Sequence, residues 1–146
     1  MATFITSQYA KAQRAGISLT ARYATFSFIT EAGTVVGDRS YCFKLPQAAT
    51  IVDAILACDD CDTNGTPTLA LTVGDVGDTA RIITTSTVGQ TGGVVRSNLN
   101  GSVSYGLNYS YVADINGVDI FVRVSASAAT AAAGTCRLVI LYTMQQ

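Results

Sequence analysis

Short runs of alternating apolar and polar residues fill most of the chain, and a period of two is the pattern of half-buried β-strands. The clearest run places Leu69, Leu71 and Val73 on one side and Ala70 and Thr72 on the other. Further runs are rich in Val, Ile, Thr, Tyr and Phe and are separated by turn residues; they lie at 20–30, 40–45, 81–87, 105–111, 118–124 and 135–144. The pattern therefore predicts an all-β chain.

Alternation within the run at 40–45 predicts that Tyr41 and Phe43 share one face of a strand, with Cys42 and Lys44 on the other. Pro46 ends this run, because proline cannot donate a hydrogen bond to a neighbouring strand.

Three other segments need separate treatment. Residues 50–58 (TIVDAILAC) fit either a buried strand or a short helix, and their β-branched start and β-rich flanks favour a strand. Residues 88–102 are rich in Gly, Ser, Asn and Gln, which predicts a long surface loop with a short strand-like element at Val94–Val95. Asn116-Gly117 predicts a tight turn before the run at 118–124.

About eight short strands separated by turns are typical of an antiparallel β-sandwich, and we expect a jelly-roll-like arrangement. A chain of 146 residues fits one domain. We expect residues 17–146 to form this single β-sandwich domain and residues 1–16 to form an N-terminal arm or a short helix. An arm that orders on binding a neighbouring molecule would be anchored by Phe4, Ile5 and Tyr9.

Composition narrows the class of function. Charged residues make up 13% of the chain, about half the usual share, so Thr, Ser, Gly and Asn must cover much of the surface. Such a surface suits a protein packed against partners, and it suits an extracellular β-domain equally well. Nine basic and ten acidic residues are scattered singly, which argues against nucleic-acid binding.

The sequence also carries no sign of a membrane location. It has no lipidation signal, and its apolar runs are too short to span a bilayer. The first residues lack the basic-then-apolar order of a signal peptide, so we expect synthesis and assembly in a cytoplasm.

The sequence offers few residues of the types that usually carry out catalysis. The absence of histidine removes the usual Ser-His-Asp and Cys-His triads and most catalytic zinc sites. Most Asp residues stand beside Gly, Asn or Thr in predicted turns, where carboxylates accept hydrogen bonds from the backbone. We therefore expect no enzymatic activity, no catalytic residue and no cofactor.

The four cysteines are expected to be free thiols in a cytoplasm. Cys58 and Cys61 form a C-x-x-C pair, which fits half of a zinc site with Cys42 and Cys136, a redox dithiol, or incidental thiols at the end of a strand. Cys42 and Cys136 lack paired spacing, and the acidic residues beside the C-x-x-C pair would raise a thiol pKa. Incidental thiols are therefore favoured.

The segment at 60–65 (DCDTNG) matches the opening of a calcium loop, in which alternate oxygen ligands surround one point. The acid that should close such a loop is replaced by Leu71, and flanking helices are not predicted. A turn rich in Asp, Asn and Gly needs no metal. If a cation binds, its ligands would be Asp60, Asp62 and Asn64.

A row of tyrosines, Tyr105, Tyr109 and Tyr111, recurs at even spacing on one face of a predicted strand. Such a row forms a core face, a contact between subunits, or a platform on which sugar rings stack.

Two stretches carry a family resemblance. Residues 69–83 (LALTVGDVGDTARII), followed by 86–93 (STVGQTGG), resemble a segment that recurs in small structural proteins of tailed bacteriophages. In those proteins a strand that ends in an Asp-Gly-Asp-type turn precedes an arginine with apolar residues and then a Gly-rich loop. Residues 133–142 (AGTCRLVILY) resemble their final strand. The resemblance covers about the last half of the chain.

The resemblance implies a virion component: a capsid decoration (cement) protein, often trimeric, that binds the major capsid protein or other virion proteins at the capsid surface and stabilises the head shell. A head-fibre, tail or baseplate module is a related implication. The alternative is a carbohydrate- or receptor-binding β-sandwich of a phage tail or fibre, which would expose the tyrosine row.

Overall fold

The computed structural model describes residues 19–26, 35–97, 111 and 115–144. These residues form eight β-strands: β1 (Leu19–Phe26), β2 (Arg39–Leu45), β3 (Ala49–Cys58), β4 (Ala70–Gly74), β5 (Ile83–Ser86), β6 (Gly93–Arg96), β7 (Val118–Ala126) and β8 (Cys136–Met144). No described residue is helical, so this part of the chain contains no helix long and apolar enough to cross a membrane.

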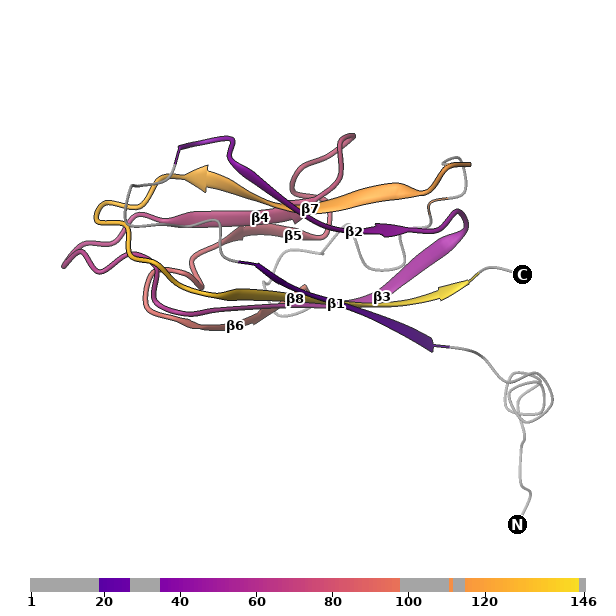
Figure 1. The fold of residues 1–146 in the computed structure, drawn as a ribbon, viewed down its shortest axis with the longest axis horizontal. Helices are drawn as coiled ribbons and strands as arrows, with labels where there is room; N and C mark the ends of the chain where they lie inside the picture. Colours follow the sequence, from indigo (N-terminus) through magenta and orange to yellow (C-terminus); the bar gives the residue numbers. More distant parts are fainter. Residues whose placement is uncertain (1–18, 27–34, 98–110, 112–114, 145–146) are drawn as a thin grey trace, which may run out of the picture.

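The strands form two four-stranded antiparallel sheets that face each other, in the orders β1-β8-β3-β6 and β2-β7-β4-β5 (Figure 1). The first strand pairs with the last, the second with the last but one, and so on inward to β4 and β5. This is the pairing of one long hairpin, folded at the β4–β5 connection and rolled up. The pairs β3–β8 and β4–β7 then join its parts into sheets. The topology is a jelly roll, so the predicted fold class is confirmed.

The ambiguous segment at 50–58 belongs to a strand, β3, and a bulge explains its mixed pattern. Ala49, Ile51, Ala54, Leu56 and Cys58 are buried, so the core residues are two positions apart except between Ile51 and Ala54, which are three apart. The pairing of β3 with β8 shifts between Ile51 and Asp53, as an extra residue in one strand requires. A spacing of three is a helical spacing, which is why the sequence alone fitted both structures.

The prediction that Tyr41 and Phe43 share a face is wrong, because β2 also contains a bulge. Its register against β7 shifts between these residues, so that Tyr41 lies opposite Phe121 and Phe43 lies opposite Ile120. Tyr41 stays on the outer face and is 61% exposed, whereas Phe43 and Cys42 pack against the core. The inserted residue reverses the side on which the following side chains lie.

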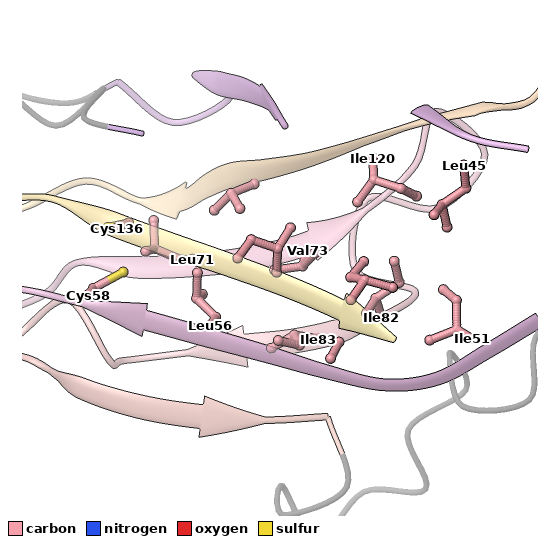
Figure 2. Packing of buried hydrophobic residues seen from close by; sticks show 14 of the residues in the cluster. Leu45, Ile51, Leu56, Cys58, Leu71, Val73, Ile82, Ile83, Ile120 and Cys136 are labelled. Carbon is pink, nitrogen blue, oxygen red and sulfur yellow. The ribbon is translucent and has the colours of Figure 1, made fainter. Parts of the chain in front are cut away.

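The core fills the space between the sheets from end to end. Figure 2 shows Leu45, Ile51 and Ile120 toward one end and Cys58 and Cys136 at the other. Burial of a large aliphatic side chain of this kind stabilises the fold by about 1.5–3 kcal/mol.

The N-terminal segment at 1–16, with Phe4, Ile5 and Tyr9, lies outside the described residues, so the predicted arm stays a prediction. The first described residue, Leu19, pairs with Thr143 near the end of β8. Since β1 is the last strand on its side of the sheet, the chain enters the sandwich at a sheet edge.

Candidate functional site

Three connecting segments meet at one end of the sandwich, beyond the ends of β3 and β7 (Figure 1). They are residues 59–69, 87–92 and 127–135, and we term this region the loop end. Backbone hydrogen bonds join them: Cys61 N donates to Gly89 O at 2.8 Å, Thr63 N to Thr130 O at 3.0 Å, and Ala132 N to Cys61 O at 3.0 Å. The segment that resembles a calcium loop therefore lies between the other two and is bonded to both.

Asp62 lies at the centre of the loop end and is buried, with only 1% of its surface exposed. Its Oδ2 accepts hydrogen bonds from the backbone N–H groups of Thr68 (2.7 Å), Leu69 (3.0 Å) and Ala129 (3.0 Å), and its Oδ1 accepts one from Thr130 (2.9 Å). Burial by itself opposes ionisation, but these donors outweigh it and hold the pKa of Asp62 well below its ordinary value. The carboxylate is therefore ionised and fully engaged.

The other two predicted cation ligands also serve the local backbone. Asp60 Oδ1 accepts a hydrogen bond from Asp62 N at 3.1 Å, and Asn64 Oδ1 accepts one from Thr66 N at 2.9 Å. Asn64 Nδ2 donates to Thr130 Oγ1 at 2.9 Å. Within the described ranges, no three His, Cys, Asp or Glu side chains are grouped to hold a metal ion. A cation at Asp60, Asp62 and Asn64 stays a prediction.

Three of the four cysteines lie in or beside the loop end and are buried: Cys58, Cys61 and Cys136. The Cys61 thiol donates a hydrogen bond to Cys136, which together with burial raises the pKa of Cys61. Cys136 in turn donates to Cys58, and this bond and burial raise the pKa of Cys136. Cys42 lies in the other sheet, where burial raises its pKa to about 11. At neutral pH these three shifted thiols are protonated and are therefore poor nucleophiles.

A second buried carboxylate, Asp75, organises the connection between β4 and β5. Its Oδ1 accepts the N–H groups of Gly77 (2.8 Å) and Asp78 (2.9 Å), and its Oδ2 accepts Arg81 Nε (2.7 Å) and the Tyr111 hydroxyl (3.0 Å). Burial opposes ionisation here as well, but the Arg81 guanidinium and the other donors lower the pKa of Asp75. The sequence pattern did not indicate the link between this segment and Tyr111.

Tyr111 is 2% exposed, and its hydroxyl is bonded to Asp75, so its ring does not present a surface for sugar stacking. Tyr105 and Tyr109 lie outside the described residues. The tyrosine platform therefore stays a prediction that would have to rest on these two residues.

The outer face of the β2-β7-β4-β5 sheet carries an aromatic cluster that sequence reasoning missed. The Phe121 ring is fully buried: Tyr41 packs edge-on against it at 5.3 Å between centroids, and the Arg39 guanidinium lies 4.6 Å from its centre. The bulge in β2 makes this cluster, and nothing local in the sequence indicates that bulge. Tyr41 is left as a large exposed ring beside a positive charge.

At the opposite end from the loop end, the turns at 45–47 and 115–117 border an open depression of about 410 Å³. Ile115 at its rim is 77% exposed, and a Lys44–Asp119 ion pair of 3.5 Å lies nearby. Apart from the adjacent pair Val35 and Val36, the other large apolar side chains that are exposed among the described residues stand singly in the sequence, which is normal on a protein surface. The described surface thus offers contact areas more readily than a reaction site.

Comparison with known proteins gives matches at the level of structure. No protein-family model and no curated protein sequence matches the chain. A chain of the cyanophage Pam1 capsid asymmetric unit is 28% identical with a TM-score of 0.71, and the match covers 88% of this chain and 86% of that one. A chain of the Ralstonia phage GP4 capsid is 31% identical with a TM-score of 0.68 and the same coverage, 88% and 86%.

A third match is more distant. A chain of the acid-stable capsid of Helicobacter pylori bacteriophage KHP30 is 14% identical, with a TM-score of 0.51 and coverage of 88% of this chain and 94% of that one. At this identity the likeness concerns the fold alone.

Proposed function

The chain belongs to the same family as the matched chain of the Ralstonia phage GP4 capsid, and on that premise we propose that it is a capsid decoration (cement) protein that binds and stabilises the head shell. It is a structural component of a virus particle. The proposal also includes attachment to the outer surface of the capsid, a trimeric state and the absence of enzymatic activity.

The observation that carries the proposal is the match to capsid chains along nearly the whole jelly roll. The GP4 and Pam1 chains align with 88% of this chain at 31% and 28% identity, so the likeness extends beyond a few shared turns. The resemblance in residues 69–93 and 133–142 falls in β4, β5, β8 and the connections beside them.

Surface chemistry supports a role in assembly. Only 13% of the residues are charged, so little charge has to lose its hydration when the surface is covered by a neighbour. Exposed apolar side chains such as Tyr41 (61%) and Val94 (66%) add contact area on both sheets. Each contact is weak, but many copies on one lattice attach strongly through avidity.

The segment before β1 is the part of the chain that we propose reaches the neighbouring molecule. Eighteen extended residues span up to about 60 Å, far enough to cross onto another subunit. Phe4, Ile5 and Tyr9 are the apolar residues of this segment that we expect to be buried in the contact.

A binding assay tests the proposal. Heads of the encoding phage that lack this protein are incubated with the purified protein, sedimented, and assayed for bound copies. We expect saturable binding with a copy number divisible by three and a higher temperature of head rupture. Replacement of Phe4, Ile5 and Tyr9 together by Ala should weaken binding about tenfold or more, because each loses buried apolar area.

The matched control replaces Thr3 and Thr6 by Ala, which changes the same segment without removing an apolar anchor. This control should bind like the unmodified protein. Failure of the unmodified protein to bind heads would overturn the decoration role, and equal binding by both variants would overturn the role of the arm.

The oligomeric state and the cation are tested together by light scattering of the purified protein with and without a chelator. The proposal predicts a trimer that the chelator leaves intact. A trimer that dissociates in chelator would instead make Asp60, Asp62 and Asn64 the ligands to replace. A monomer in both conditions would contradict a preformed trimer.

A further inference from the structure

Cys58 and Cys136 occupy a special position in the β3–β8 pair. Cys58 is the last residue of β3 and lies opposite Cys136, the first residue of β8. Immediately beyond them, Asp59 N donates to Thr135 O at 3.0 Å and Thr135 N donates to Asp59 Oδ2 at 3.0 Å, so Asp59 and Thr135 occupy a hydrogen-bonded position of the ladder. Hydrogen-bonded and non-hydrogen-bonded pairs alternate along an antiparallel ladder, so Cys58 and Cys136 form a non-hydrogen-bonded pair.

This position suits a covalent bond between the two side chains. In a non-hydrogen-bonded pair the Cα atoms are about 4.5 Å apart and the side chains are at their closest. Disulfides span Cα separations of about 4.4–6.8 Å. Both residues are buried, and Figure 2 shows them together at one end of the core.

We propose that Cys58 and Cys136 form an intramolecular disulfide when the protein meets an oxidising small-molecule disulfide, and that the free thiols of this structure are the reduced form of that pair. One cysteine thiolate attacks the small disulfide, forms a mixed disulfide and expels one small thiolate. The second cysteine thiolate attacks the mixed disulfide, forms the Cys58–Cys136 bond and expels the other. The two thiols lose two protons and two electrons, and the small disulfide is reduced to two thiols.

Access to the thiols limits the rate of this reaction. Cys58 is 7% exposed and Cys136 is 1% exposed, so the loop end must open before a small disulfide can reach either of them. The reactive form is the thiolate, and the Cys136 thiol is protonated at neutral pH because its hydrogen bond to Cys58 and its burial raise its pKa. Oxidation is therefore slow in the closed molecule and accelerates as the pH rises.

Cys61 is the competing partner, because its thiol also lies against the start of β8. A side chain added to Gly134 would place its Cβ 2.5 Å from Cys61 Sγ, so this sulfur packs directly on the backbone near Cys136. Cys61 belongs to the loop rather than to the ladder, and no strand register sets its distance from Cys136. The register therefore assigns the bond to Cys58 and Cys136.

The bond would close the chain segment from 58 to 136, which contains β4 to β7, and would limit the freedom of the unfolded chain. Closing so long a segment should raise the Tm by about 5–10 °C. Under the proposed function, a particle assembled in a reducing cell and released into an oxidising medium would gain this bond after assembly. The bond itself can be tested on the isolated protein, whether or not the protein binds a head shell.

The experiment uses the Cys42→Ala protein, which removes the thiol in the other sheet and leaves the three at the loop end. It is equilibrated at about pH 8.5 with oxidised and reduced glutathione, and the remaining thiols are trapped with an alkylating reagent. Peptide mass spectrometry then identifies the linked cysteines, and thermal unfolding compares the oxidised and reduced forms.

The expected result is a peptide pair joined through Cys58 and Cys136, an alkylated Cys61, and the higher Tm in the oxidised form. The Cys42→Ala/Cys61→Ala protein should show the same link and the same gain in Tm. Both proteins keep Cys58 and Cys136, so the test requires no substitution of either residue of the bonded pair. A link between Cys61 and Cys136, persistent free thiols at Cys58 and Cys136, or a link that lowers the Tm would each overturn the proposal.

Discussion

The loop end depends on one side chain, Asp62, more than on any other that the structure describes there. Its carboxylate accepts four backbone hydrogen bonds and so joins residues 68–69 to residues 129–130. The second pair of donors is more than 60 positions away in the sequence. A buried charge is costly unless it is fully hydrogen-bonded, and here the donors supply that compensation. Asp62 thus holds two loops together by accepting hydrogen bonds from the backbone N–H groups of both.

Replacement of Asp62 by Ala should lower the free energy of unfolding by about 2–3 kcal/mol, because backbone N–H groups would lose their acceptor in a partly buried region. The matched control is Asn64→Ala in the same loop. Asn64 is exposed and accepts only one backbone hydrogen bond among the described contacts, so its loss should cost less than about 1 kcal/mol. Urea unfolding measures both; similar losses in the two variants would contradict the role of Asp62.

Stability should fall steeply in acid. The pKa values of Asp62 and Asp75 are lowered in the folded protein, although burial alone would raise them, because hydrogen-bond donors favour the ionised forms. As the pH falls, the unfolded chain therefore takes up these protons first, at about pH 4, and stability is lost below that point. Above about pH 5 the contribution of both groups is fully present.

The urea midpoint, followed from about pH 7 to about pH 2.5, checks this dependence. Asp62→Asn removes one of the two titrating groups. The urea midpoint of this variant should therefore fall less steeply with decreasing pH than that of the unmodified protein, even though the variant is less stable at neutral pH. Equal slopes in the two proteins would show that Asp62 does not carry the effect.

At the scale of elements, the β4–β5 connection is the point at which the long hairpin folds back. Asp75 N donates to Asp78 O at 3.0 Å and Ile82 N donates to Val73 O at 2.9 Å, so the loop turns tightly over the end of β4. A Cβ at Gly74 would lie 2.2 Å from Asp78 O, which leaves no room for a side chain. Glycine is required there by close approach of the backbone.

Gly74→Ala should therefore cost about 2–3 kcal/mol of stability, since the loop must shift away from β4. Gly65→Ala in the loop end is the control, because a Cβ there would meet nothing within 4 Å. Thermal unfolding should place the Gly65 variant close to the unmodified protein and the Gly74 variant well below it. A Gly74 variant of normal Tm would mean that the loop is not held as the structure has it.

Most strands were predictable from the sequence because period-two alternation is a local property. The runs at 40–45, 69–73 and 118–124 correspond to β2, β4 and β7, and even the short element at Val94–Val95 lies in β6. Bulges were not predictable, because their cause lies in the partner strand. The face of Tyr41 was therefore assigned wrongly, and the segment at 50–58 fitted two structures.

The residues of the loop end were all noticed in the sequence, but as separate motifs. The C-x-x-C pair and the calcium-like segment overlap at 58–65, and nothing local indicates that the Asp62 side chain turns toward residues 129 and 130. Pairing of Cys58 with Cys136 follows from the register of β3 and β8, which are distant in the chain. Local patterns predict elements, whereas these contacts depend on topology.

At the scale of the whole molecule, the jelly roll leaves most of its interior to apolar packing and its ends to loops. The two carboxylates that are buried among the described residues, Asp62 and Asp75, hold connections together. Few residues of the chain are charged, and the described surface carries exposed apolar side chains, which suits repeated shallow contacts in a symmetric shell. These features fit the proposed attachment to a capsid.

Electron cryo-microscopy of the phage particle that encodes this chain tests that claim most directly. We expect jelly-roll density of this topology on the outer surface of the head, in clusters of three, with the segment before β1 in contact with a shell protein or a neighbouring copy. Density of this fold found only in the tail or fibres, or an intact particle without it, would overturn the proposed attachment to the capsid.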